Sequence, residues 1–122
     1  MIKPRILIVD DEKQVREGLA DFLLKRLDCE AVICPNGEAA VEALSAGEFH
    51  VLIQDLHMPG ISGFDVIDQA KKKYAGIIIL VITKWDDPAY TRMIEAAGAI
   101  YVPKPLALKA VLRILESELQ KR

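Results

Sequence analysis

Five times along this chain, a short apolar run is followed by a longer segment with one apolar helical face. The runs are Arg5 to Val9, Glu30 to Cys34, Val51 to Gln54, Ile77 to Ile82 and Ala99 to Val102. Short apolar runs bounded by turn signals are typical of buried strands. Strands that alternate with helices across short loops form parallel sheets with helices on both faces. The pattern therefore predicts an α/β fold built on a doubly wound, parallel, five-stranded sheet.

Capping residues and glycines mark the ends of the predicted helices. Asn36 and Ser62 are of the type that accepts hydrogen bonds at helix N-termini, and Pro88 suits a first turn. Gly47 and Gly98 follow the last helical residues of two segments. The apolar face after Pro88 is expected to turn inward with Tyr90, Met93, Ile94 and Ala97.

Composition excludes several classes of protein. The chain has 122 residues, of which 52% are hydrophobic, and a formal net charge of -2, so it fits one ordinary domain rather than a disordered segment. Acids and bases are interspersed, which argues against contact with nucleic acid or a membrane surface. The longest apolar run, Ile77 to Ile82, is far shorter than the roughly 20 residues that span a bilayer, and residues 1–5 lack a signal-peptide core. Cys29 and Cys34 are expected to be reduced thiols of a cytoplasmic protein.

Polar side chains follow four of these runs. Asp10 and Asp11 follow the first, Asp55 the third, Thr83 the fourth and Lys104 the fifth. The carboxyl ends of parallel strands lie along one edge of the sheet, and open α/β sheets bind their ligands at that edge. We therefore expect three carboxylates, a hydroxyl and an ammonium group to share one crevice.

Carboxylates this close need a compensating cation. Two like charges about 4 Å apart repel by roughly 4 kcal/mol at an effective dielectric constant of about 20. Lys104 offsets one charge, and ligands that are all oxygen favour Mg²⁺. A metal, an acid, a hydroxyl and an ammonium group together suit a phosphoryl group. A carboxylate such as Asp55 can attack phosphorus and form an aspartyl phosphate, while the cations and Thr83 stabilise the transferred oxygens.

The chain resembles the CheY-like receiver domains of two-component response regulators over essentially its whole length. The residues that carry the resemblance are Asp10-Asp11, Asp55 before Leu-His-Met-Pro-Gly, Thr83, and Tyr101 with Lys104-Pro105. The resemblance implies a flavodoxin-like (βα)5 fold with the sheet order 2-1-3-4-5. It also implies one receiver domain over residues 1–122, with no output domain.

Within that family, the resemblance makes Asp55 the phosphoacceptor. A histidine kinase or a phosphotransfer protein would supply the phosphoryl group in a two-component system or phosphorelay. Mg²⁺ would be bound by Asp11, Asp55 and the backbone carbonyl of His57, and Asp10 would hold it through water. Such a module is not a metabolic enzyme, although it catalyses its own phosphorylation and dephosphorylation.

The resemblance also assigns the output. Thr83 and Lys104 would contact the phosphoryl group, and Thr83 with Tyr101 would form the switch pair that changes a protein-binding surface. The Lys104-Pro105 peptide bond would be cis. A downstream protein would be the target, without direct contact of this domain with nucleic acid or membrane. Homodimer formation stays open, and Ile114, which lies off the apolar face of the last helix, is one candidate for such a surface.

Two local features depart from the family pattern. Lys84 and Trp85 follow Thr83, where a small residue is usual, and we expect them to alter the lifetime of the phosphoryl group. The segment from Gly98 to Tyr101 is one residue shorter than usual, which bears on the coupling of Tyr101 to Thr83.

Two other functions remain as alternatives. A pseudo-receiver would bind proteins without phosphorylation, but the complete acidic set argues against it. A hydrolase with an aspartate nucleophile would need a second acid two residues after Asp55, where the chain has His57. No P-loop or Gly-x-Gly-x-x-Gly motif follows the first run, and Asp10-Asp11-Glu12 would repel the phosphate of a flavin nucleotide.

Overall fold

The computed structural model describes residues 3–58, 60–105 and 107–122, in which five strands alternate with five helices. The turn signal at Pro59 lies outside the described residues. The elements are β1 Arg5–Val9, α1 Lys13–Arg26, β2 Glu30–Cys34, α2 Gly37–Ala46, β3 Val51–Asp55, α3 Gly63–Lys73, β4 Ile78–Thr83, α4 Pro88–Ala96, β5 Ile100–Pro103 and α5 Leu108–Gln120. All paired strands are parallel and the sheet order is β2-β1-β3-β4-β5, which confirms the predicted fold.

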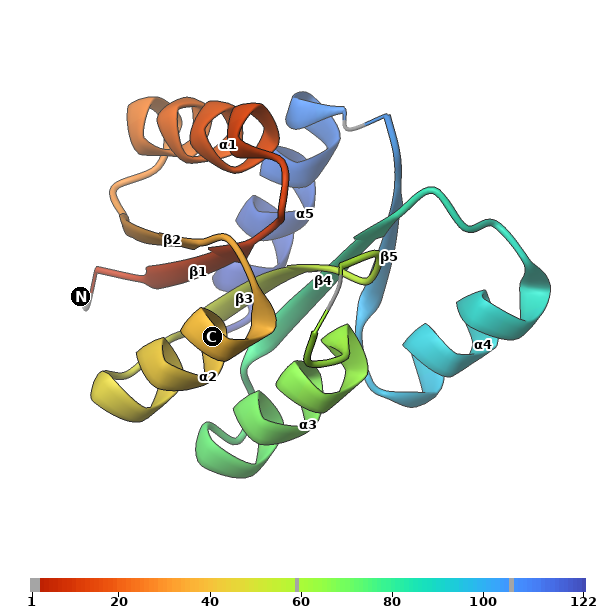
Figure 1. The fold of residues 1–122 in the computed structure, drawn as a ribbon. Coiled ribbons are helices and arrows are strands. Elements are labelled where there is room, and N and C mark those ends of the chain that lie inside the picture. The colour runs from red at the N-terminus through yellow and green to blue at the C-terminus, as the bar shows by residue number, and fades with distance from the viewer. Residues whose placement is uncertain (1–2, 59, 106) are drawn as a thin grey trace.

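Helices cover both faces of the sheet, with α1 and α5 on one side and α2, α3 and α4 on the other (Figure 1). Side chains alternate along β1, so that Ile6 contributes to one core cluster and Leu7 to the other. The central strands β3 and β4 are buried at every position. Two buried faces explain why these two strands read as continuous apolar runs rather than as alternating ones.

The predicted N-caps are confirmed. Asn36 Oδ1 accepts a hydrogen bond from Ala39 N at 2.8 Å, and Ser62 Oγ accepts one from Phe64 N at 3.2 Å. Pro88 occupies the first turn of α4. Each helix is the next element after a strand, so the N-termini of the helices lie on the side of the sheet where the strands end.

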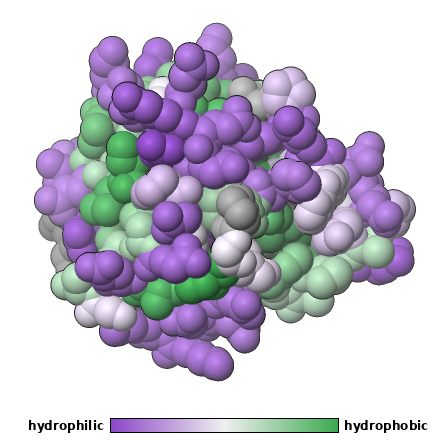
Figure 2. Space-filling view, in the orientation of Figure 1, coloured by the Kyte–Doolittle hydropathy of each residue, from purple (hydrophilic) through white to green (hydrophobic). Residues whose placement is uncertain are grey.

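Two predictions about side chains were wrong. Met93 on α4 is 49% exposed, because only Ile94 of this helix is fully buried at the margin of the sheet. Ile114 is partly buried and packs against the core, because α5 contacts α1 as well as the sheet and its buried face is wider than one stripe. Hydrophilic side chains cover most of the surface seen in Figure 2, with smaller hydrophobic areas between them. Among the described residues, no helix combines the length and the apolar character needed to cross a bilayer.

Candidate functional site

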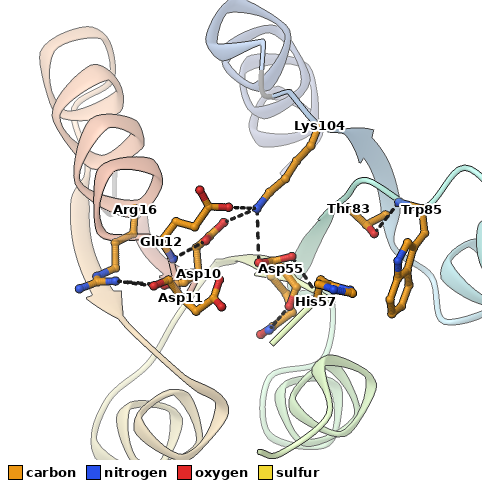
Figure 3. A network of polar contacts seen from close by, with 10 residues as sticks. Asp10, Asp11, Glu12, Arg16, Asp55, His57, Thr83, Trp85 and Lys104 are labelled. Carbon is orange, nitrogen blue, oxygen red and sulfur yellow. Dashed lines mark hydrogen bonds and ion pairs between the residues drawn. The ribbon is translucent and has the colours of Figure 1, made fainter. Parts of the chain in front are cut away.

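The sheet brings the predicted residues to one edge. Asp55 is the last residue of β3, Thr83 is the last of β4, and Lys104 follows β5 directly. Asp10 follows β1, whose last residue is paired with Gln54, so Asp10 lies beside Asp55. Figure 3 shows the carboxylates of Asp10 and Asp55 turned toward the Lys104 ammonium group from different strands.

Lys104 is the central cation of this site. Its Nζ lies 3.2 Å from Asp10 Oδ2, 3.3 Å from Glu12 Oε1 and 3.4 Å from Asp55 Oδ2. Only 8% of its side chain is exposed. The sequence predicted that Lys104 offsets one charge, and the structure shows that it contacts three carboxylates. Glu12 was not among the predicted site residues, although its place directly after Asp10-Asp11 was a signal for it.

Burial changes the acidity of these groups. The pKa of Asp55 is raised, because burial disfavours the charged form and Asp10 repels it. A hydrogen bond from His57 N and the attraction of Lys104 lower this pKa, but they do not outweigh burial and repulsion. Burial also raises the pKa of Asp10, although Glu12 N donates to its Oδ1 at 2.8 Å and Lys104 attracts it. Burial by itself lowers the pKa of Lys104, but Asp55 and Asp10 outweigh it, so the pKa is raised and Lys104 remains an ammonium ion.

The acidic cluster has the donor set of a hard divalent cation. Asp10, Asp11 and Asp55 each offer one carboxylate oxygen, and these oxygens lie within 4.8 Å of one another. Asp10 Oδ2 is buried and close to Lys104 Nζ, yet no described group donates to it with hydrogen-bond geometry. An acceptor of this kind, beside the exposed Asp11, fits a cation bound by oxygen ligands such as Mg²⁺. At His57, the backbone N donates to Asp55 Oδ1 at 3.0 Å and the residue is exposed.

The predicted switch residues lie on one face of the sheet. Thr83 is fully buried, and its Oγ1 accepts a hydrogen bond from Trp85 N at 3.0 Å. Tyr101 is paired with Val81, two residues before Thr83, so the two side chains are diagonal neighbours on the same face. Tyr101 is partly buried against the core. The Lys104-Pro105 peptide bond is cis, as predicted.

An aromatic group stands beside the acids. The Trp85 ring meets the His57 ring edge-on, with centroids 4.6 Å apart, and lies tilted against Tyr90 at 4.5 Å. Trp85 and His57 help to line a hollow of about 360 Å³ together with Asp11, Leu56 and Met58. Lys84 is exposed. Of the two bulky residues after Thr83, it is therefore Trp85 that forms a wall next to the site.

Comparison with known proteins gives a consistent result. The sequence pattern of the response regulator receiver domain matches residues 6–116. The chain is 31% identical over 114 residues to the response regulator protein FleR of Pseudomonas aeruginosa, which covers 91% of the chain and 24% of that protein. It is 26% identical over 112 residues to the response regulator RR06 of Streptococcus pneumoniae, covering 92% of the chain and 51% of that protein. The chain thus spans about half or less of the length of these relatives.

Solved structures match the fold. A CheY-like response regulator receiver domain protein from Methanospirillum hungatei superposes with a TM-score of 0.90 at 21% identity, covering 98% of this chain and 96% of that one. The chemotaxis protein CheY4 of Vibrio cholerae gives a TM-score of 0.85 at 24% identity, covering 95% and 98%.

Proposed function

Because this chain belongs to the response regulator receiver domain family, a class of signalling modules, we propose that Asp55 is its phosphoacceptor. The observation that carries the proposal is the position of Lys104 Nζ, which lies 3.4 Å from Asp55 Oδ2 and 3.2 Å from Asp10 Oδ2. Asp55 is a buried carboxylate beside a fixed ammonium ion and further acids. This arrangement suits the transfer of a phosphoryl group, whose oxygens are negatively charged. No comparable constellation of acids is found elsewhere in the described residues.

Each residue of the site has its own role in the phosphoryl transfer. A carboxylate oxygen of Asp55 attacks the phosphorus of a phosphohistidine, the P–N bond breaks, and its electron pair stays on the imidazole nitrogen. Lys104 neutralises charge on the transferred oxygens, and the Thr83 hydroxyl donates to one of them after leaving Trp85 N. Mg²⁺, held by Asp11, Asp55 and the His57 carbonyl with Asp10 acting through water, would neutralise further phosphoryl charge. Attack of water on the same phosphorus breaks the P–O bond to Asp55, releases inorganic phosphate and returns Asp55 to its free carboxylate.

The partners follow from this chemistry. A histidine kinase or phosphotransfer protein is the donor, and a downstream protein reads the surface that Thr83 and Tyr101 change. We propose no direct contact of residues 1–122 with nucleic acid or membrane, and we treat these residues as one receiver domain. Both cysteines are free and lie in opposite core clusters, which fits a reducing, cytoplasmic location.

The test is the intact mass of the protein after incubation with Mg²⁺ and phosphoramidate. A gain of one phosphoryl group, about 80 Da, is expected for the wild type and for Asp68→Ala, an exposed control on α3. The gain should be absent in Asp55→Ala and in wild type treated with a chelator. Folded wild type without the gain would refute the proposal and favour a pseudo-receiver.

A further inference from the structure

Gln54 is a buried amide that nothing in the transfer chemistry uses. It precedes Asp55 in β3, is fully buried, and is paired with Val9 of β1 and Val81 of β4. Its Nε2 donates to the Asp55 carbonyl oxygen at 2.7 Å, while its Oε1 is buried and accepts no hydrogen bond from the described residues. A buried acceptor without a donor destabilises a fold, so an apolar residue would suit this position better. Violations of this kind are expected where function requires them.

The end of β1 explains why the Asp55 carbonyl needs this donor. Leu56 N donates to Ile82 O, so Leu56 presents its backbone groups to β4, and Asp55, one residue earlier, presents its carbonyl toward β1. The pairing of β1 with β3 ends at Val9 and Gln54. Outside the ladders, no backbone N–H of the described residues donates to the Asp55 carbonyl. The Gln54 amide therefore replaces the missing ladder partner.

The peptide between Asp55 and Leu56 determines where the Asp55 carboxylate lies. Two residues after Asp55, His57 N donates to Asp55 Oδ1 at 3.0 Å, which fixes one oxygen of the carboxylate. The first residue of α3 closes the other side, because a Cβ at Gly63 would lie 3.2 Å from Asp55 O and 3.3 Å from Gln54 Cγ. With Gln54 on one side and α3 on the other, the Asp55–Leu56 peptide has little freedom to rotate.

We propose that Gln54 is a positioning residue that holds the Asp55–Leu56 peptide and, through it, the Asp55 carboxylate and the His57 backbone. It contacts neither the phosphoryl group nor a metal. The inference rests on the proposed phosphorylation of Asp55 and adds a residue that supports it from inside the sheet.

The test compares Gln54→Met with Leu52→Met, a matched control two residues earlier on the same buried face. With saturating Mg²⁺ and phosphoramidate, Gln54→Met should gain the phosphoryl group about tenfold more slowly than wild type, as when other supporting contacts of a metal site are lost. Its melting temperature should stay within about 4 °C, because loss of one hydrogen bond is offset by removal of the unpaired oxygen. Hydrogen exchange at the His57 amide should be faster in Gln54→Met alone.

Each outcome of these measurements supports or overturns the proposed role of Gln54. Equal phosphorylation rates in Gln54→Met and wild type would overturn the proposal. A slower rate that follows a large drop in melting temperature, or that Leu52→Met shares, would also overturn it, because it would indicate general disruption of β3. If wild type itself gains no phosphoryl group, the proposed function fails first and the role of Gln54 fails with it.

Discussion

Replacing Asp55 by asparagine should stabilise this protein when divalent metal is absent. The substitution keeps the shape of the side chain and removes a buried negative charge next to Asp10. We expect the free energy of unfolding at pH 7.5 to rise by about 1–2 kcal/mol. A gain of stability on removing a functional group is the opposite of what most substitutions at buried sites produce.

The magnitude follows from opposing contributions at the site. Carboxylate oxygens of Asp10 and Asp55 lie within 4.8 Å of each other, which corresponds to a repulsion of about 3.5 kcal/mol at an effective dielectric constant of about 20. Lys104 Nζ at 3.4 Å attracts Asp55 by about 5 kcal/mol on the same scale. Burial of the charge then adds several kcal/mol against ionisation, and the hydrogen bond from His57 N returns about 2 kcal/mol. The raised pKa of Asp55 shows that the sum disfavours the carboxylate.

The effect has a definite dependence on pH. Because the pKa of Asp55 is raised in the folded state, the folded protein binds its proton more tightly than the unfolded chain does. Stability from this group is therefore greatest in acid and is lost as pH rises through the folded pKa. The advantage of Asp55→Asn should therefore be larger at pH 7.5 than in acid, and it should shrink toward pH 4, near the ordinary pKa of an aspartate, about 3.9.

The assay is urea unfolding of wild type, Asp55→Asn and the exposed control Asp68→Asn, in a chelator and again in Mg²⁺. Metal should stabilise wild type by about 1.4 kcal/mol when its concentration is tenfold above Kd, and the variant much less. An unchanged or lower free energy of unfolding for Asp55→Asn at pH 7.5 would refute the reasoning. A gain that persists undiminished at pH 4 would show that charge is not its cause.

Three further outcomes are expected. Lys104→Met should lower the free energy of unfolding by about 3 kcal/mol at pH 7.5, because Asp10 and Asp55 lose their cation; urea unfolding measures this, and a loss below 1 kcal/mol would contradict it. Thr83→Ala should abolish any change in Trp85 fluorescence on phosphorylation while leaving the mass gain at Asp55, because Trp85 N bonds to Thr83 Oγ1; an unchanged fluorescence response would exclude this link. Tyr74→Phe should lower the free energy of unfolding by about 1–2 kcal/mol in thermal unfolding, because the one hydroxyl hydrogen of Tyr74 is shared between Leu44 O and Gly47 O, whereas Tyr90→Phe should lower it less.

The arrangement of the site could be predicted from the sequence, because it depends on the direction in which the strands run. Apolar runs fixed the strands, and a parallel sheet places the residues that follow them along one edge. Asp10, Asp55 and Lys104 therefore had to meet once the strand order was known. That order came from the resemblance to receiver domains, because alternation alone does not choose among the orders of a doubly wound sheet.

Contacts that depend on the length of a side chain or on the tilt of a helix could not be predicted from the sequence. Glu12 and Asp11 are adjacent acids, and only the start of α1 decides that Glu12 turns to Lys104. Helical spacing placed Met93 and Ile94 on one inward face, but at the margin of the sheet only Ile94 is covered. Gln54 was counted within an apolar run, and its hydrogen bond to the Asp55 carbonyl can be predicted only when the end of β1 is known.

Unequal burial of the three carboxylates around Lys104 indicates which contact a phosphoryl group would displace. The side chains of Asp10 and Asp55 are 2% and 1% exposed, whereas that of Glu12 is 55% exposed. An exposed ion pair contributes little, because water and salt screen it. A phosphoryl group on Asp55 offers Lys104 a stronger partner, and Glu12 is the acid that can exchange its contact for water. Glu12→Gln should therefore leave phosphorylation at Asp55 nearly unchanged, whereas Asp10→Asn should weaken the dependence of phosphorylation on Mg²⁺. Equal effects of the two substitutions would refute the inference that Glu12, rather than Asp10, releases Lys104.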